Sequence, residues 1–224
     1  MKKNVYCVFD VETVGIDKKW IYDIGLSIIE KKGEVLFSDS WVIEEVFNND
    51  SLMRTAYFGS KKQSHYLPKI ANRELKVHSF MSTRSDFNYI INQFGVTHIT
   101  AYNIAFDKSA IQQTMEFIGN NNKFLQKPLQ FFDIWEGACR SLFSQKSYQK
   151  MAIENGWVSN AGNFRTNAEV AFRYIKDEPN FIESHTALED SLIESEILQA
   201  VLRQKKKITR NSIYSHPWRI PNKR

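Results

Sequence analysis

The hydrophobic pattern of the chain opens with β-strands. Residues 4–10 (NVYCVFD) form a β-branched and aromatic run, which is typical of a buried strand. Two further runs, residues 21–30 and 34–43, are separated by a Lys-Lys-Gly turn and predict a β-hairpin. Residues 44–77 mix charges, a glycine, a proline and scattered aromatics, and indicate no more than one or two short helices.

The second part of the chain alternates between helical and extended patterns. Apolar residues at helical spacing predict helices over residues 82–94, 105–118, the segment through Ala138 and Leu142, 149–155, 167–175 and 186–203. Short β-type runs lie between them at residues 97–102 and 129–134. A hairpin followed by alternating helices and strands predicts one α/β domain, with a mixed β-sheet flanked by helices.

Composition excludes several classes of protein. The chain has 224 residues, of which 42% are hydrophobic and 13% aromatic, so it can bury a core and is not disordered over most of its length. No apolar run approaches the roughly 20 residues that cross a bilayer, and the acids at positions 10 and 12 interrupt the first apolar run in a way that does not fit a secretory signal. Cys7 and Cys139 are too few for a disulfide framework, so we expect reduced thiols in a cytoplasmic protein.

The net charge of +5 is unevenly distributed. Residues 203–224 contain eight basic residues and no acid, whereas residues 1–202 carry 22 basic and 25 acidic groups. The chain is therefore predicted to consist of a slightly acidic domain, residues 1–202, and a basic, aromatic C-terminal tail, residues 203–224. Such a tail is typical of a segment that binds nucleic acid or another polyanion, and the alternative is a solvated, frayed terminus.

Two acids follow the first strand. Asp10 ends the apolar run and Glu12 lies two residues further on, so both side chains point to the same face of an extended chain. They would present two carboxylates to one point. Taken alone, the pair is equally compatible with an ordinary polar strand end.

Two later segments also place acids where a site could form. Asp107 opens a helix directly after a predicted strand, where it could also serve only to complement the helix dipole. His185 and Asp190 are about 140° apart on a helix of 3.6 residues per turn, so they face one cavity only if His185 lies at or before the helix start. The alternative for His185 is a capping or partly buried histidine.

The combination of these segments resembles a known family. In order, the chain contains Phe9-Asp10-Val11-Glu12-Thr13-Val14-Gly15, Asn103-Ile104-Ala105-Phe106-Asp107 and His185-Thr186-Ala187-Leu188-Glu189-Asp190. These motifs resemble those of the DEDD superfamily of 3′–5′ exonucleases, in the subgroup with a histidine in the last motif. The epsilon proofreading subunit of bacterial DNA polymerase III, RNase T and oligoribonuclease belong to this subgroup.

The resemblance spans about residues 4–202, with two departures. Tyr102 stands where the family commonly has a histidine, and residues 44–77 match no part of the family pattern. Asp133, which follows the predicted strand 129–134, matches an aspartate commonly found there in the family, and we interpret it as structural.

The resemblance implies a fold and a set of roles. The fold would be a ribonuclease-H-like mixed sheet flanked by helices. Clustered carboxylates repel one another unless cations bind, and oxygen ligands without cysteine favour Mg²⁺ or Mn²⁺ over Zn²⁺. By resemblance, two Mg²⁺ ions, for which Mn²⁺ could substitute, would be held by Asp10, Glu12, Asp107 and Asp190. His185 would be the general base, and Thr13 and Val14 would lie beside the terminal nucleotide. Asn103 would either hold the loop of the second motif or touch the substrate.

The expected activity is therefore hydrolysis of terminal phosphodiesters from the 3′ end of DNA, single-stranded or at duplex ends, with release of nucleoside monophosphates. The motifs do not separate DNA from RNA, so an exoribonuclease of the RNase T or oligoribonuclease kind is an alternative. Another alternative is a proofreading subunit whose tail docks on a polymerase or other replication protein. A binding module without activity is disfavoured, because all five site residues are present.

Overall fold

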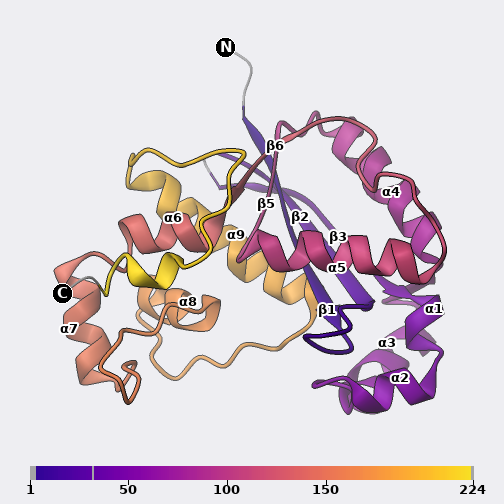
Figure 1. The fold of residues 1–224 in the computed structure, drawn as a ribbon, viewed down its shortest axis with the longest axis horizontal. Helices are drawn as coiled ribbons and strands as arrows, with labels where there is room; N and C mark the ends of the chain where they lie inside the picture. The colour runs from indigo at the N-terminus through magenta and orange to yellow at the C-terminus, as the bar shows by residue number, and fades with distance from the viewer. Residues whose placement is uncertain (1–3, 32, 223–224) are drawn as a thin grey trace.

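The centre of the protein is a six-stranded mixed β-sheet (Figure 1). The computed structural model describes residues 4–31 and 33–222. In chain order the strands are β1 (Val5–Thr13), β2 (Ile21–Glu30), β3 (Val35–Ile43), β4 (Lys76–His78), β5 (His98–Ala101) and β6 (Gln130–Asp133). Their order across the sheet is β4-β3-β2-β1-β5-β6, and β2 runs antiparallel to both of its neighbours while the other pairs are parallel.

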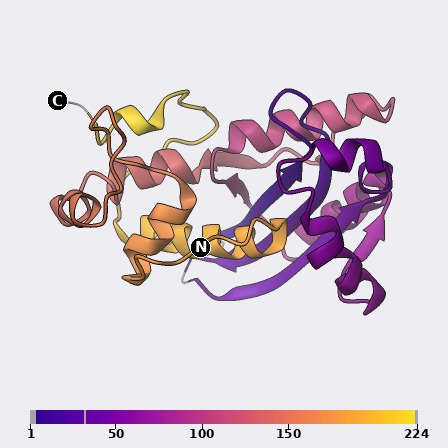
Figure 2. The same ribbon diagram turned by 90° about the horizontal axis from the view of Figure 1, so that it is seen from below.

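Helices cover both faces of this sheet, and Figure 2 shows α5 on one side of it and α9 on the other. The longer helices are α4 (Phe80–Gln93), α5 (Ile104–Phe117), α6 (Ile134–Ser141), α7 (Lys146–Glu154), α8 (Ala168–Lys176) and α9 (Ala187–Arg203). The shorter ones are α1 (Glu44–Phe47), α2 (Asp50–Thr55), the π-helix η1 (Lys62–Tyr66), α3 (Leu67–Ala71) and the 3₁₀-helix η2 (Pro217–Arg219). The expected fold class, a single α/β domain with a mixed sheet flanked by helices, is confirmed.

Strand β1 is apolar on both faces because it lies between two cores. Cys7 and Phe9 pack with α4 and α5, whereas Tyr6 and Val8 pack with α6 to α9. Since side chains alternate along a strand, the even-numbered Asp10 falls on the α9 face, and so does Glu12. The register of β1 therefore decides on which side of the sheet these two carboxylates lie.

The segment between β3 and α4 differs most from the expectation. Residues 44–77 were expected to hold one or two short helices, but they form α1, α2, η1, α3 and most of β4. These elements have three to six residues each, too short for a periodic signal. They pack on a third apolar cluster that includes Tyr66, whose hydroxyl donates to Asp23 on β2 at 2.7 Å. This long-range contact attaches the segment to the sheet.

Helix α4 also begins earlier than the pattern predicts. Its N-terminal cap is Ser79, whose hydroxyl accepts a hydrogen bond from the Ser82 backbone N–H at 3.2 Å. Ser82, where the predicted helix begins, lies inside the first turn of α4. Three serines at residues 79, 82 and 85 offer competing caps, and tertiary packing of the buried Phe80 selects the first.

The C-terminal segment after α9 lies against the domain. In Figure 1 the yellow chain returns over α6 before η2. The Asn211 backbone N–H donates to the Phe131 carbonyl at 2.7 Å, and Asn222 bonds to both backbone groups of Phe164. Pro217 is buried. The role of the basic tail in binding nucleic acid stays a prediction.

Two further features bear on the expectations from composition. Both cysteines, Cys7 and Cys139, are buried and free, so neither takes part in a disulfide. Among the described residues, the helices are all too short or too polar to span a bilayer.

Helix α9 approaches β2 so closely that only glycine fits between them. A Cβ atom on Gly25 would lie 2.3 Å from the backbone carbonyl carbon of Ala187 and 2.3 Å from the backbone nitrogen of Leu188. Gly25 is also the register partner of Asp10 on β1. The first turn of α9 thus rests directly on the sheet, next to the strand that carries Asp10.

We expect the substitution Gly25→Ala to destabilise the protein by about 1–3 kcal/mol, because the added methyl group must push the α9 backbone away from β2. Urea unfolding measures the change. Gly15→Ala is the matched control, since nothing lies within 4 Å of a Cβ at that position. Equal stability of the two variants would contradict this account of the contact.

Candidate active site

Carboxylates from three elements line one pocket of about 250 Å³. Four of them come from the end of β1, the first turn of α5 and the first turn of α9. The five residues expected at the site all line it: Asp10, Glu12, Asp107, His185 and Asp190. The structure therefore brings together residues that are up to 180 positions apart in the sequence.

The turn before α5 sets the position of Asp107. Asn103 takes a left-handed backbone conformation (φ 68°), and its N–H donates to the Asp133 carboxylate at 3.0 Å. Asp133 also accepts from the Trp135 N–H at 2.8 Å and so caps α6. It thus fixes the turn between β5 and α5, in agreement with its interpretation as a structural residue.

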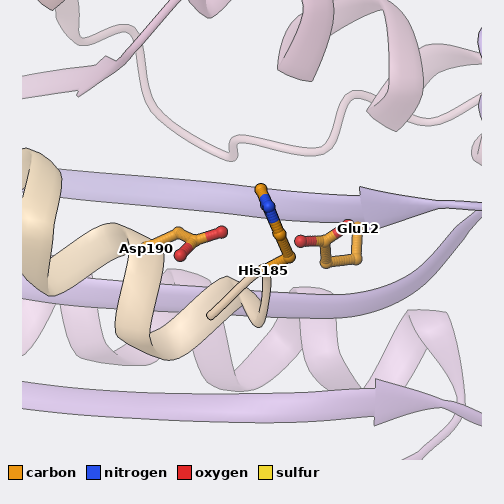
Figure 3. Close-up of side chains that lie close together, drawn as sticks. All are labelled: Glu12, His185 and Asp190. Atoms are coloured by element: carbon orange, nitrogen blue, oxygen red, sulfur yellow. The ribbon is translucent and has the colours of Figure 1, made fainter. Parts of the chain in front are cut away.

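His185 and Asp190 meet because α9 starts between them. The helix begins at Ala187, so His185 precedes it, with a left-handed backbone (φ 53°). One potential ligand atom from each of Glu12, His185 and Asp190 lies within 4.8 Å of the others. Figure 3 shows the two carboxylates on either side of the imidazole ring.

Burial makes these carboxylates hard to ionise. Loss of solvent, followed by repulsion from neighbouring acids, raises the pKa of Asp10 to about 8, that of Glu12 to about 9 and that of Asp190 to about 10. The pKa of Asp107 is also raised well above its usual range, again first by burial. None of the four belongs to an ion pair within the described residues.

The same pocket has the chemistry of a divalent cation site. Asp190 Oδ1 is buried and has no hydrogen-bond partner among the described residues. An unpaired buried carboxylate is costly, and a cation at this point would compensate it. Because the clustered ligands are mostly carboxylate oxygens, they fit Mg²⁺ or Mn²⁺.

Three further acids belong to the site and were not expected from the sequence. Glu194 is 3% exposed and accepts the Tyr102 N–H at 3.0 Å, so it joins α9 to the end of β5. It lies one turn after Asp190, a spacing that could have revealed it. Glu183 lines the pocket, and burial raises its pKa to about 7. Asp23 faces Glu12 across the β1–β2 pair and accepts the Ala187 N–H at 3.1 Å.

Two residues of the 44–77 segment hold His185 from outside. The Phe58 ring stacks on the imidazole, with ring centroids 4.1 Å apart and planes 14° apart. Lys61 Nζ donates to the His185 carbonyl at 3.4 Å. Burial, and then the charge of Lys61, lowers the pKa of His185, so its neutral form is favoured. No sequence signal marked either contact, because both depend on how this segment folds back.

The residues expected beside a terminal nucleotide have different surroundings. Asn103 lines the acidic pocket. The Thr13 hydroxyl donates to the Gly15 carbonyl at 3.1 Å, and the Val14 side chain is 4% exposed in the third apolar cluster. Any contact of Val14 with a ligand would have to come from its backbone. These three contacts stay predictions.

Tyr102, the departure from the family pattern, lines the acidic pocket but uses its hydroxyl outside the group of acids. Its hydroxyl donates to the carbonyl of Thr166, and its ring stacks near Trp135. It therefore contributes to packing between β5 and the segment before α8.

Comparison with solved structures shows where this fold occurs. The zinc-bound complex of E. coli exonuclease I with single-stranded DNA aligns with a TM-score of 0.55 and 14% identity, over 92% of this chain and 42% of that one. Its complex with a dA16 oligonucleotide aligns with a TM-score of 0.55 and 12% identity, over 90% of this chain and 41% of that one. Cell-death related nuclease 4 aligns with a TM-score of 0.58 and 13% identity, over 98% of this chain and 76% of that one. This chain has the fold of these nucleases.

The likeness extends to the architecture and not to the sequence. No protein-family model matches the chain, and no curated protein matches it. The chain spans about two fifths of the length of exonuclease I. The expected fold class, a ribonuclease-H-like mixed sheet flanked by helices, is confirmed by this comparison together with the strand order.

We expect Mg²⁺ binding to release protons at neutral pH. The raised pKa values leave Asp10, Glu12 and Asp190 largely protonated in the metal-free protein, whereas a cation requires their charged forms. Higher pH weakens this competition, so the affinity for Mg²⁺ should increase with pH through the range of these pKa values, up to about pH 10. Calorimetric titration in two buffers of different ionisation enthalpy counts the protons.

The variant Asp190→Asn provides the control for this measurement. It removes one titrating group and should release fewer protons on binding Mg²⁺. An affinity that does not change with pH, with no proton release in the unsubstituted protein, would show that the carboxylates are already charged.

Proposed function

We propose that this protein is a metal-dependent 3′–5′ exonuclease of the DEDD type, which removes nucleoside monophosphates from DNA 3′ ends. The observation that carries the proposal is the convergence of three separate motifs on one acidic pocket. A purely structural role for these motifs is disfavoured, because burying four carboxylates without an ion pair among the described residues opposes folding.

The solved structures of similar fold support a nucleic-acid substrate. Exonuclease I has been crystallised with single-stranded DNA and with dA16 and dT13 oligonucleotides. A single-stranded 3′ end is accordingly the substrate we propose here. The pocket is small and acidic, so a phosphodiester would enter it only after its charge is balanced.

The proposed chemistry divides the work between acids and histidine. Asp10, Glu12, Asp107 and Asp190 would hold two divalent cations, which supply Lewis acidity and an activated water when bound. His185 would accept the proton of the attacking water, and its lowered pKa keeps it in the neutral, proton-accepting form. The turns before α5 and α9 position the carboxylates of Asp107 and Asp190 in this pocket.

Digestion of a single-stranded DNA oligomer in Mg²⁺ tests this proposal. An oligomer labelled at its 5′ end should shorten one nucleotide at a time. With a label at the 3′ end, the label should be released at once in a mononucleotide. We expect His185→Ala to reduce turnover about 10²- to 10⁴-fold, the range for a lost general base. Asp190→Asn should remove metal-dependent activity. Full activity in this variant would contradict the proposed exonuclease site.

Two controls keep the result interpretable. Lys150→Gln changes an exposed ion pair on α7 and should leave activity intact. A matched RNA oligomer in the same assay decides between a deoxyribonuclease and an exoribonuclease. Urea unfolding of each variant separates loss of chemistry from loss of fold.

Phe58 should matter for turnover rather than for substrate affinity. Phe58→Ala leaves the His185 ring without its stacking partner, and misplacement of a catalytic group by about 1 Å can cost up to about 100-fold. We therefore expect kcat to fall about 10- to 100-fold with KM little changed. Steady-state kinetics measures both parameters.

The matched comparisons for Phe58 are a conservative and a distant variant. Phe58→Tyr retains an aromatic ring and should recover most of kcat. Tyr89→Ala removes an aromatic side chain that is 68% exposed on α4, on the other face of the sheet, and should have no effect. A rise in KM with constant kcat would instead mean that Phe58 contacts the substrate.

A further inference from the structure

A second cavity, of about 500 Å³, lies on the opposite face of the sheet from the acidic pocket. It is bounded by α5, by β5 and β1 beneath it, and by residues 123–129 of the loop after α5. Its apolar surface comes mainly from Phe9, Ile99, Ile104, Ile111, Phe124 and Leu129. A volume of this size with an apolar lining is typical of a site for a small ligand.

The loop wall of the cavity is held in place by α4. Asn88 donates to the Phe124 carbonyl at 2.8 Å and accepts the Gln126 N–H at 2.8 Å. Arg84 donates two hydrogen bonds to the Lys123 carbonyl, at 2.7 and 2.9 Å. These bonds fix the loop backbone, so the cavity is preformed and does not depend on a ligand for its shape.

The charged groups around the cavity have a single sign. Three lysines line it, at positions 108, 123 and 127, and no acid does. None of them forms an ion pair within the described part of the chain. Lys108 Nζ lies 3.9 Å from the centre of the Phe131 ring, and Lys127 Nζ donates to the Ile91 carbonyl at 3.4 Å. The three lysines thus border an apolar chamber, without an anionic partner among the described residues.

We propose that this cavity binds an amphiphilic carboxylate, with its hydrocarbon part against Phe9, Ile104 and Ile111 and its carboxylate at the lysines. A neutral apolar ligand would use the chamber but not its charge, and an amphiphilic cation would be repelled. The proposal goes beyond the nuclease function and does not depend on it, because the lining contains none of the residues of the acidic pocket.

Calorimetric titration of the full chain with octanoate, nonanoate and decanoate tests the site. Affinity should increase about fourfold with each methylene, from the free energy of burying that group. Decanoate should bind more tightly than decanol, and decyltrimethylammonium should not bind measurably. Equal affinities for decanoate and decanol would overturn the proposal.

Variants of the lining locate the binding. The double substitution Lys108→Gln and Lys123→Gln should weaken decanoate about two- to fivefold for each exposed charge removed, with decanol unaffected. Lys150→Gln, an exposed lysine on α7, should change neither. The substituted lysines are all exposed, so we expect the double variant and the Lys150→Gln variant to fold.

Ile111→Trp gives an independent test. Ile111 is half-buried and lines the cavity, so the larger side chain would fill the space that the ligand needs. It should abolish binding of decanoate while urea unfolding remains cooperative. Unchanged decanoate binding by a folded Ile111→Trp variant, or by the double lysine variant, would place any bound carboxylate elsewhere and overturn the proposal.

Discussion

The candidate site depends on the contact between the first turn of α9 and the backbone of β2. Gly25 has no side chain to hold them apart, and Asp23 accepts the N–H of Ala187 at the helix start. Because Gly25 pairs with Asp10 in the β1–β2 register, this contact sets Asp190 over Asp10. A helix placed one side chain further away would separate the two carboxylates and weaken the repulsion that adds to the effect of burial on the pKa of Asp190.

This placement creates an electrostatic problem that shapes the rest of the site. Asp10, Glu12 and Asp190 are kept from water and repel one another, and the charge of Lys61 offsets this only in part, so their charged forms are disfavoured. Asp23 and Glu194 use backbone N–H groups to secure the helix and the end of β5. The backbone at the start of α9 and at the end of β5 thus has hydrogen-bond partners, whereas Asp190 Oδ1 at the centre of the site has none among the described residues.

The sequence allowed the long elements and the proximity of the main acids to be predicted, but not the surroundings of the site. Alternation in β1 predicts that Asp10 and Glu12 share a face, and the helical period requires His185 to precede α9, as it does. Phe58 and Lys61 could not be found in this way. They lie between α2 and η1, in a connection whose position is set by contacts such as that of Tyr66 with β2 rather than by local periodicity.

The C-terminal segment has a consequence for the edges of the sheet. Strand β6 ends the sheet on one side, and both outward-facing backbone groups of Phe131 are occupied by Asn211, through its backbone N–H and its side-chain oxygen. At the other edge, β4 is three residues long and carries an exposed lysine, Lys76. Exposed edge strands recruit other strands, and short length, charge and covering chain prevent this. The C-terminal segment thus covers this edge of the sheet at Phe131 and hinders its pairing with another strand.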